Sequence, residues 1–99
     1  MVARRKEATL VMSSILRRAH DVQAACYYEI TADAEAQLLL RIMGIFARND
    51  LVPDRWSSVR MGAHQRIDIQ MAFLAHEDGL RLLHRIRNLV GILHADMIH

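Results

Sequence analysis

Two segments of this chain repeat one pattern of apolar residues, and the repeat limits the possible folds more than any other feature. Each member of the second set lies forty-four positions after its counterpart in the first. The residues are Leu38, Leu39, Ile42, Ile45 and Phe46 in the first segment and Leu82, Leu83, Ile86, Leu89 and Val90 in the second. A period of about 3.6 residues gathers each set on one side of a helix. The sequence therefore predicts two equivalent amphipathic helices that pack on a common surface.

Four stretches between and beside these helices have the alternation or the composition of β-strands. The third is the clearest, because Ile67, Ile69, Met71 and Phe73 alternate with largely polar residues and are expected to form a buried face. Aromatic and β-branched residues favour extended structure in the first stretch. We expect strands at 24–30, 55–61, 65–74 and 92–98.

The ends of the two helices follow from capping residues and helix breakers. Thr31–Asp33 is expected to cap the first helix, which continues to about Asn49 because Pro53 forbids a longer one. The acidic residues in His76–Asp78 favour the start of the second helix. That helix is expected to include the whole repeated pattern and to end at Gly91.

The element order is therefore βαββαβ, which predicts an α+β, ferredoxin-like fold. In this fold a four-stranded antiparallel sheet carries both helices on one face. A domain of 99 residues buries only about 60% of its unfolded surface, and its core is marginal without association. We therefore expect a homodimer in which the sheet is extended through the edge at Arg55–Met61.

Charge is distributed unevenly along the chain. Residues 1–20 contain five basic side chains and one acidic side chain, a net charge of +4, although the whole chain carries +2. We assign residues 1–23 to a basic N-terminal extension and residues 24–98 to the folded domain. A solvated terminus explains the extension most simply, while contact with nucleic acid or an acidic partner stays open. A short helix and an added strand both remain open for Ala8–Ile15.

Several classes of protein are excluded by what the sequence lacks. Cys26 is the only cysteine, and no apolar run approaches the roughly 18 residues of a membrane span. We expect a soluble, cytoplasmic protein with no membrane partner. The six histidines lack the spacing of metal ligands, and no nucleophile adjoins a base. No catalytic residue, metal site or cofactor is therefore expected.

An RNA-recognition role is excluded by the exposed face of the third strand. Such domains need stacking aromatic side chains on that face, whereas this chain offers Arg66, Asp68 and Gln70. The folded domain also lacks a basic patch that would follow a phosphate backbone. Nucleic acid is therefore not an expected partner of the folded domain.

Three segments resemble ACT domains, and specifically the short small subunits of acetolactate synthase. Arg41–Asn49 resembles the first helix of that family, with its Arg-x-x-Gly-x-Phe pattern. Arg66–Gln70 resembles the third strand, and Leu83–Met97 resembles the closing helix and strand. The resemblance covers about residues 24 to 98. It implies a non-catalytic regulatory domain that forms a homodimer and binds a catalytic large subunit in branched-chain amino-acid biosynthesis.

The resemblance also implies where an amino-acid effector would bind. In members that sense amino acids, the site combines the loop after the first strand with the start of the second strand. A polar residue and a glycine of that loop align here with Ala34 and Gln37. The full set of implied ligand-binding residues is Asp33, Ala34, Glu35, Gln37, Val52 and Pro53. A side chain at position 37 obstructs the backbone approach that glycine permits, so weak or absent valine binding is expected.

The expected function is thus a regulatory subunit of acetolactate synthase. The alternative is a free-standing, homodimeric ACT-like module that senses an amino acid or another small molecule. An enzyme that uses the fold as a scaffold is a more distant third possibility. A sensor should bind its effector without a catalytic chain, whereas a regulatory subunit should co-purify with one large protein.

Overall fold

The computed structural model describes residues 23–98, which form four strands and two helices. These elements are β1 (Gln23–Asp33), α2 (Ala36–Arg48), β2 (Arg55–Met61), β3 (His64–Ala75), α3 (His76–Arg87) and β4 (Ile92–Ile98). The order βαββαβ confirms the predicted fold, and the bounds of β2 and β4 are as predicted. The expectations for residues 1–22, including those for Ala8–Ile15, lie outside the described residues. No helix within 23–98 is long and apolar enough to span a membrane.

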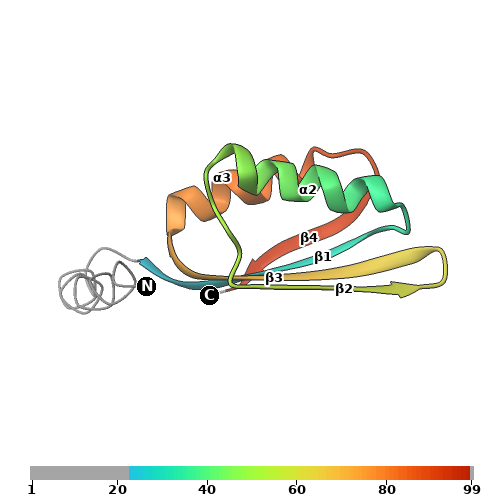
Figure 1. The fold of residues 1–99 in the computed structure, drawn as a ribbon, viewed down its shortest axis with the longest axis horizontal. Helices are drawn as coiled ribbons and strands as arrows, with labels where there is room; N and C mark the ends of the chain where they lie inside the picture. Colours follow the sequence, from blue (N-terminus) through green and yellow to red (C-terminus); the bar gives the residue numbers. More distant parts are fainter. Residues whose placement is uncertain (1–22, 99) are drawn as a thin grey trace, which may run out of the picture.

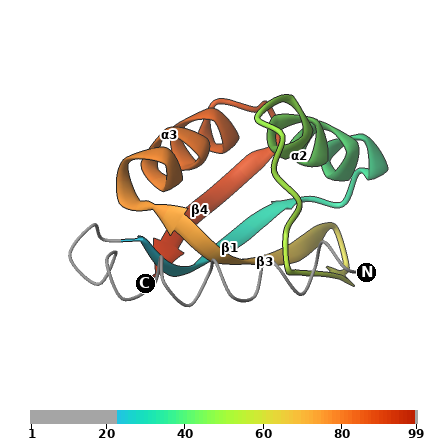
Figure 2. The same cartoon turned by 60° about the vertical axis from the view of Figure 1, so that its left-hand side comes forward.

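The sheet is antiparallel and has the strand order β2-β3-β1-β4. Both helices lie on the same face, as Figures 1 and 2 show, and the opposite face is open. Strands β3 and β1 occupy the centre, so β2 and β4 are the two edges. This is the ferredoxin-like arrangement with two right-handed crossovers.

The core forms where the two helical stripes meet the inner face of the sheet. Ile42 and Ile86 are fully buried, and Tyr28 of β1 meets Phe46 of α2 edge to face with ring centroids 5.8 Å apart. The Tyr28 hydroxyl donates a hydrogen bond of 2.8 Å to the carbonyl oxygen of Gly79 in α3. One side chain thus joins the central strand to both helices, because its ring packs on one and its hydroxyl binds the other.

The prediction for Phe73 is wrong, because a β-bulge interrupts the alternation of β3. Cys26 pairs with Met71 but Ala24 pairs with Leu74, so two residues of β3 oppose one residue of β1. The extra residue reverses the two faces of the strand beyond Met71. Leu74 therefore enters the core, and Phe73 is 52% exposed.

The second helix ends earlier than predicted. Helix α3 stops at Arg87, so Leu89 is only half-buried and Val90 is 84% exposed. Gly91 has a φ of 101°, and a Cβ there would lie 2.8 Å from Leu38 Cδ1. Glycine is needed because the chain turns through the left-handed region directly against α2, and it does not serve as the helix terminator.

Strand β1 is longer than predicted, and this changes the start of α2. The ladder with β3 continues to Asp33, which pairs with His64. Thr31 and Asp33 therefore belong to the strand and do not cap the helix. The residue at the N-cap is Glu35, whose side chain makes no capping hydrogen bond, and no acidic residue occupies the first turn.

Candidate functional site

The β1–α2 loop is fixed by backbone hydrogen bonds to two distant turns. The Asp33 amide donates to the carbonyl oxygen of Gly91 at 2.8 Å, and the Ala34 amide donates to that of Ala63 at 3.0 Å. The Glu35 amide donates to the carbonyl oxygen of Asp33 at 2.8 Å. These three amides already have acceptors and are not free to bind a ligand.

Gln65 holds this loop through side-chain hydrogen bonds to its backbone, and no feature of the sequence predicted that role. It is the buried polar residue of the described core, and its side-chain Nε2 donates to the carbonyl oxygens of Asp33 at 2.8 Å and Glu35 at 3.0 Å. The pattern of β3 placed Gln65 on the buried face, but its partners are backbone atoms about thirty positions away. A buried amide that satisfies two carbonyls holds the loop in one conformation.

The helix-start amides that remain are those of Ala36 and Gln37. Amides in the first turn of a helix have no acceptor within it, and these two bind no other described residue. The side chain of Gln37 is exposed and accepts a 3.5 Å hydrogen bond from Arg41 Nη2. The carboxylates of Asp33 and Glu35 are close in the sequence to these amides, and their negative charge opposes the binding of a ligand carboxylate there.

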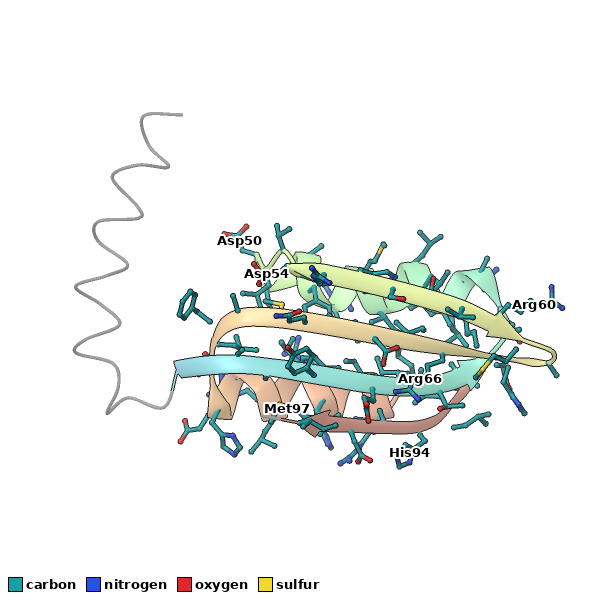
Figure 3. All side chains as sticks on the ribbon, turned by 90° about the horizontal axis from the view of Figure 1, so that it is seen from below. Asp50, Asp54, Arg60, Arg66, His94 and Met97 are labelled. Atoms are coloured by element: carbon teal, nitrogen blue, oxygen red, sulfur yellow. The ribbon has the colours of Figure 1, made fainter. Side chains whose placement is uncertain are left out.

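The structure does not bring the predicted site residues together within one chain. Asp33, Ala34, Glu35 and Gln37 lie at the start of α2, whereas Val52 and Pro53 follow its end. In Figure 3 Asp54, which directly follows Pro53, lies at one end of β2, and Arg60 lies at the other. Val52 is 85% exposed. Only a second molecule can complete a site that uses both groups.

The β2 edge of the sheet is open and is flanked by apolar side chains. Every residue of Arg55–Met61 is exposed except Trp56, which is half-buried. Within residues 23–98, no side chain hydrogen-bonds to the backbone of this strand. A hollow of about 210 Å³, the β2-edge hollow, lies between the strand and α2. It is lined by Met43, Phe46, Ala47, Leu51, Val52, Pro53 and Trp56.

The β4 edge is instead occupied by charged side chains. Arg87 Nε donates to the carbonyl oxygen of Ala95 at 2.8 Å, and Arg87 Nη2 lies 3.0 Å from Asp96 Oδ1. The other oxygen of Asp96 lies 2.6 Å from His94 Nε2. Charged groups on an edge strand oppose pairing with another chain. The two edges of the sheet are therefore not equivalent.

The centre of the open face of the sheet carries charges of both signs. Arg66 at its centre lies 3.0 Å from Glu29 Oε2 and 3.3 Å from Asp68 Oδ1 (Figure 3). The guanidinium group is thus paired with carboxylates of two strands. Tyr27 of β1 is 44% exposed and Phe73 of β3 is 52% exposed, so the strands also present aromatic side chains to solvent.

The remaining candidates for chemistry among residues 23–98 are metal ligands and the thiol of Cys26. These residues contain no group of three His, Cys, Asp or Glu side chains that could hold a metal ion. Cys26 is buried, and burial raises the pKa of its thiol, which keeps it protonated. A protonated, buried thiol is a small core side chain and not a nucleophile.

The strand order and the two helices on one face define a class, the small α+β domains of ferredoxin-like topology. The sequence pattern of one family, described as ACT-like domain, matches residues 18–99. The chain therefore belongs to the ACT-like domain family. Domains of this family are generally regulatory and non-catalytic. No curated protein sequence matches the chain significantly.

Solved structures agree with this fold at low sequence identity. The crystal structure of the ACT domain from GTP pyrophosphokinase of Chlorobium tepidum has a TM-score of 0.68 and 9% identity, and the match covers 77% of this chain and 99% of that chain. The solution structure of the same domain gives a TM-score of 0.65 at 13% identity, over 78% of this chain and 88% of that one. The C-terminal domain of the MgtC protein from Mycobacterium tuberculosis gives 0.62 at 12% identity, over 79% and 87%.

Proposed function

We propose that this chain is a non-catalytic regulatory subunit that forms a homodimer through β2 and binds a catalytic large subunit. The observation that carries the proposal is the contrast between an open, apolar-flanked β2 edge and a β4 edge occupied by Arg87 and Asp96. An unprotected edge strand presents unpaired backbone groups that can pair with another chain. A second copy supplies a matching edge strand and a matching apolar flank.

A two-fold dimer at this edge also completes the candidate site. Antiparallel pairing of two β2 strands places the start of one beside the end of the other. The end of β2 leads to Ala63, whose carbonyl oxygen already binds the amide of Ala34. Val52 and Pro53 of the second copy therefore approach the Asp33–Gln37 loop of the first copy. In this arrangement the six predicted residues form one site at each end of the interface.

Gly44 in α2 adds independent support for a close partner on that helix. A Cβ at this position would make only an ordinary contact of 3.6 Å with Arg48 Nη1, so the chain itself does not require glycine. Glycine within a helix costs about 1 kcal/mol relative to alanine. Nearby Leu40 is 69% exposed and Met43 is 46% exposed. A partner backbone that packs closely against α2 explains both the glycine and the exposed apolar side chains.

The proposed partner is the catalytic subunit of acetolactate synthase, on the basis of the resemblance at Arg41–Asn49. Mixing the purified chain with that subunit should raise the rate of acetolactate formation and give a complex that co-elutes in gel filtration. Leu40→Glu should weaken both effects, because it places a charge on the exposed face of α2. His84→Glu, on the exposed side of α3, is the matched control. Unchanged activity together with separate elution would reject this partner.

The effector site is expected to bind valine weakly or not at all. Isothermal titration calorimetry with valine, leucine and isoleucine should show no saturable binding below about 1 mM, which corresponds to about 4 kcal/mol. Gln37→Gly combined with Ala34→Asn should create or strengthen binding, because backbone amides become accessible and a polar side chain is added. Micromolar valine affinity in the unmodified protein would overturn this part of the proposal.

The second candidate is a free-standing homodimeric sensor of an amino acid or another small molecule. The unbonded amides of Ala36 and Gln37 favour it, since a helix start of this kind receives anions. The same calorimetry separates the two candidates. Tight binding by the isolated dimer, combined with no effect on a catalytic chain, supports the sensor.

A further inference from the structure

A second hollow lies between the two helices and is not part of the candidate site. It has a volume of about 230 Å³ and is bounded by the residues that follow α2, one side of α3 and the end of β3. We call it the α2–α3 hollow. Its lining consists of two arginines, one aspartate, one asparagine and three leucines: Arg81, Arg85, Asp78, Asn49, Leu51, Leu74 and Leu82.

The charged side chains of this hollow leave one cation without a partner. Arg81 Nη1 lies 3.4 Å from Asp78 Oδ1, an ion pair within one turn of α3. Arg85, one turn further along, forms no ion pair with any residue of 23–98. The lining therefore carries a net charge of +1. A single guanidinium group with free donors matches one carboxylate, which it can bind through two parallel hydrogen bonds.

The three leucines supply the apolar part of the lining and, with Asn49, limit the size of the occupant. Leu74 and Leu82 are buried and form the floor, and Leu51 is half-buried at one side. A volume of about 230 Å³ is below the roughly 300 Å³ at which pockets begin to hold drug-sized ligands. The occupant therefore combines one negative charge with a short apolar body.

We propose that the α2–α3 hollow binds a small aliphatic monocarboxylate, with its carboxylate on Arg85 and its hydrocarbon part against Leu74 and Leu82. A doubly charged anion such as a phosphate ester fits less well, because Asp78 would repel the additional charge. The site is separate from the Asp33–Gln37 loop, which lies at the opposite end of α2.

Leu51 connects this hollow with the proposed interface. The same residue lines the α2–α3 hollow on one side and the β2-edge hollow on the other. Its amide donates a 2.9 Å hydrogen bond to the carbonyl oxygen of Phe46, which fixes it to the end of α2. Binding of the carboxylate does not depend on dimer formation. Any effect of carboxylate binding on dimer formation through β2 rests on the proposed function.

The test is a titration of the full chain, labelled at its leucine and methionine methyl groups, with 4-methylpentanoate in the NMR spectrometer. Saturable shifts of the Leu51, Leu74 and Leu82 methyl signals are expected with a dissociation constant of about 1 mM. Arg85→Gln should weaken binding at least about tenfold, because the charge-assisted hydrogen bonds are lost. Arg60→Gln, an equal loss of charge at the far end of β2, should leave it unchanged.

The neutral isostere 4-methylpentan-1-ol tests recognition of the carboxylate and should bind at least about tenfold more weakly. Equal binding of the alcohol, equal binding by the Arg85→Gln protein or absence of saturation would overturn the proposal. Shifts confined to Met43, which lines only the β2-edge hollow, would also overturn it. None of these outcomes depends on a catalytic partner or on the oligomeric state, so failure here is distinguishable from failure of the proposed function.

Discussion

The two edges of the sheet differ in chemistry although both are strands of seven residues. At β4, Arg87 donates a hydrogen bond to the backbone and pairs with Asp96, which also contacts His94. Strand β2 has no side chain bound to its backbone among the described residues, and apolar residues of α2 lie beside it. A sheet that is not closed must have two edges. In the proposed homodimer, the contacts of Arg87 and Asp96 protect β4 against pairing, whereas β2 is available for it.

Both edge strands depend on the same hydrophobic core. Two substitutions in β3, one at a buried position and one at an exposed position, test which side chains belong to that core. Ile69→Asp should abolish the cooperative melting transition, because the desolvation of a buried, unpaired charge costs several kcal/mol, comparable with the stability of a small domain. Phe73→Asp should cost less than about 1 kcal/mol, since the bulge places this side chain in solvent. Circular dichroism during thermal unfolding measures both. Equal destabilisation by the two variants would contradict the register of β3.

A smaller effect is expected at Tyr28, which joins the central strand to both helices. Tyr28→Phe should cost about 1–3 kcal/mol, because the carbonyl oxygen of Gly79 loses its buried donor. Burial raises the pKa of Tyr28 above its ordinary value, so the folded state favours the neutral phenol. Its stabilisation is therefore fully present below a pH of about 10, the ordinary pKa, and is lost as the pH rises above it.

Urea unfolding between pH 8 and pH 11 measures this dependence. The free energy of unfolding should fall more steeply with pH in the unmodified protein than in Tyr28→Phe. Both proteins are compared with Cys26 replaced by alanine, because burial raises the pKa of the Cys26 thiol and its hydrogen bond with Tyr28 lowers it, so the thiol would titrate differently in the two proteins. Identical slopes would show that the phenol is not desolvated in the folded state.

At the β4 edge we expect the smallest effect on stability and, separately, an effect on assembly. Arg87→Ala should lower the free energy of unfolding by about 1 kcal/mol or less, because its ion pair is half-exposed. Removal of the guanidinium group should, however, allow a second pairing surface at β4. Light scattering should then detect species larger than a dimer. An unchanged size distribution would mean that Arg87 does not protect the edge.

Local patterns in the sequence predicted the framework of the fold because each pattern was decided by neighbouring residues. The stripes that contain Ile42 and Ile86 have helical spacing, and Pro53 and Gly62 separate β2 from the elements around it. Those features do not depend on which segment packs against which. The fold class, the element order and the bounds of two strands could therefore be predicted.

The remaining features depend on contacts between distant segments, which alternation and capping signals do not contain. The bulge at Phe73 arises from the pairing of β3 with β1, and Gln65 binds carbonyl oxygens of a loop about thirty positions away. Arg87 reaches β4 after the chain has turned at Gly91. The candidate site residues were identified by resemblance alone, and their separation at two ends of α2 required the three-dimensional fold.

The central claim, that β2 and not β4 is the association edge, is tested most directly by one matched pair of substitutions. Val59 in β2 is 55% exposed and Leu93 in β4 is 54% exposed, so Val59→Lys and Leu93→Lys add the same charge at equally accessible edge positions. Sedimentation equilibrium of both variants and the unmodified chain at micromolar concentration measures the dimer dissociation constant. The unmodified chain and Leu93→Lys should be dimers of equal affinity, whereas Val59→Lys should dissociate at least about tenfold more readily, because lysine on an edge strand opposes pairing. A Val59→Lys dimer as stable as the unmodified one, or selective loss of the dimer in Leu93→Lys, would contradict the account.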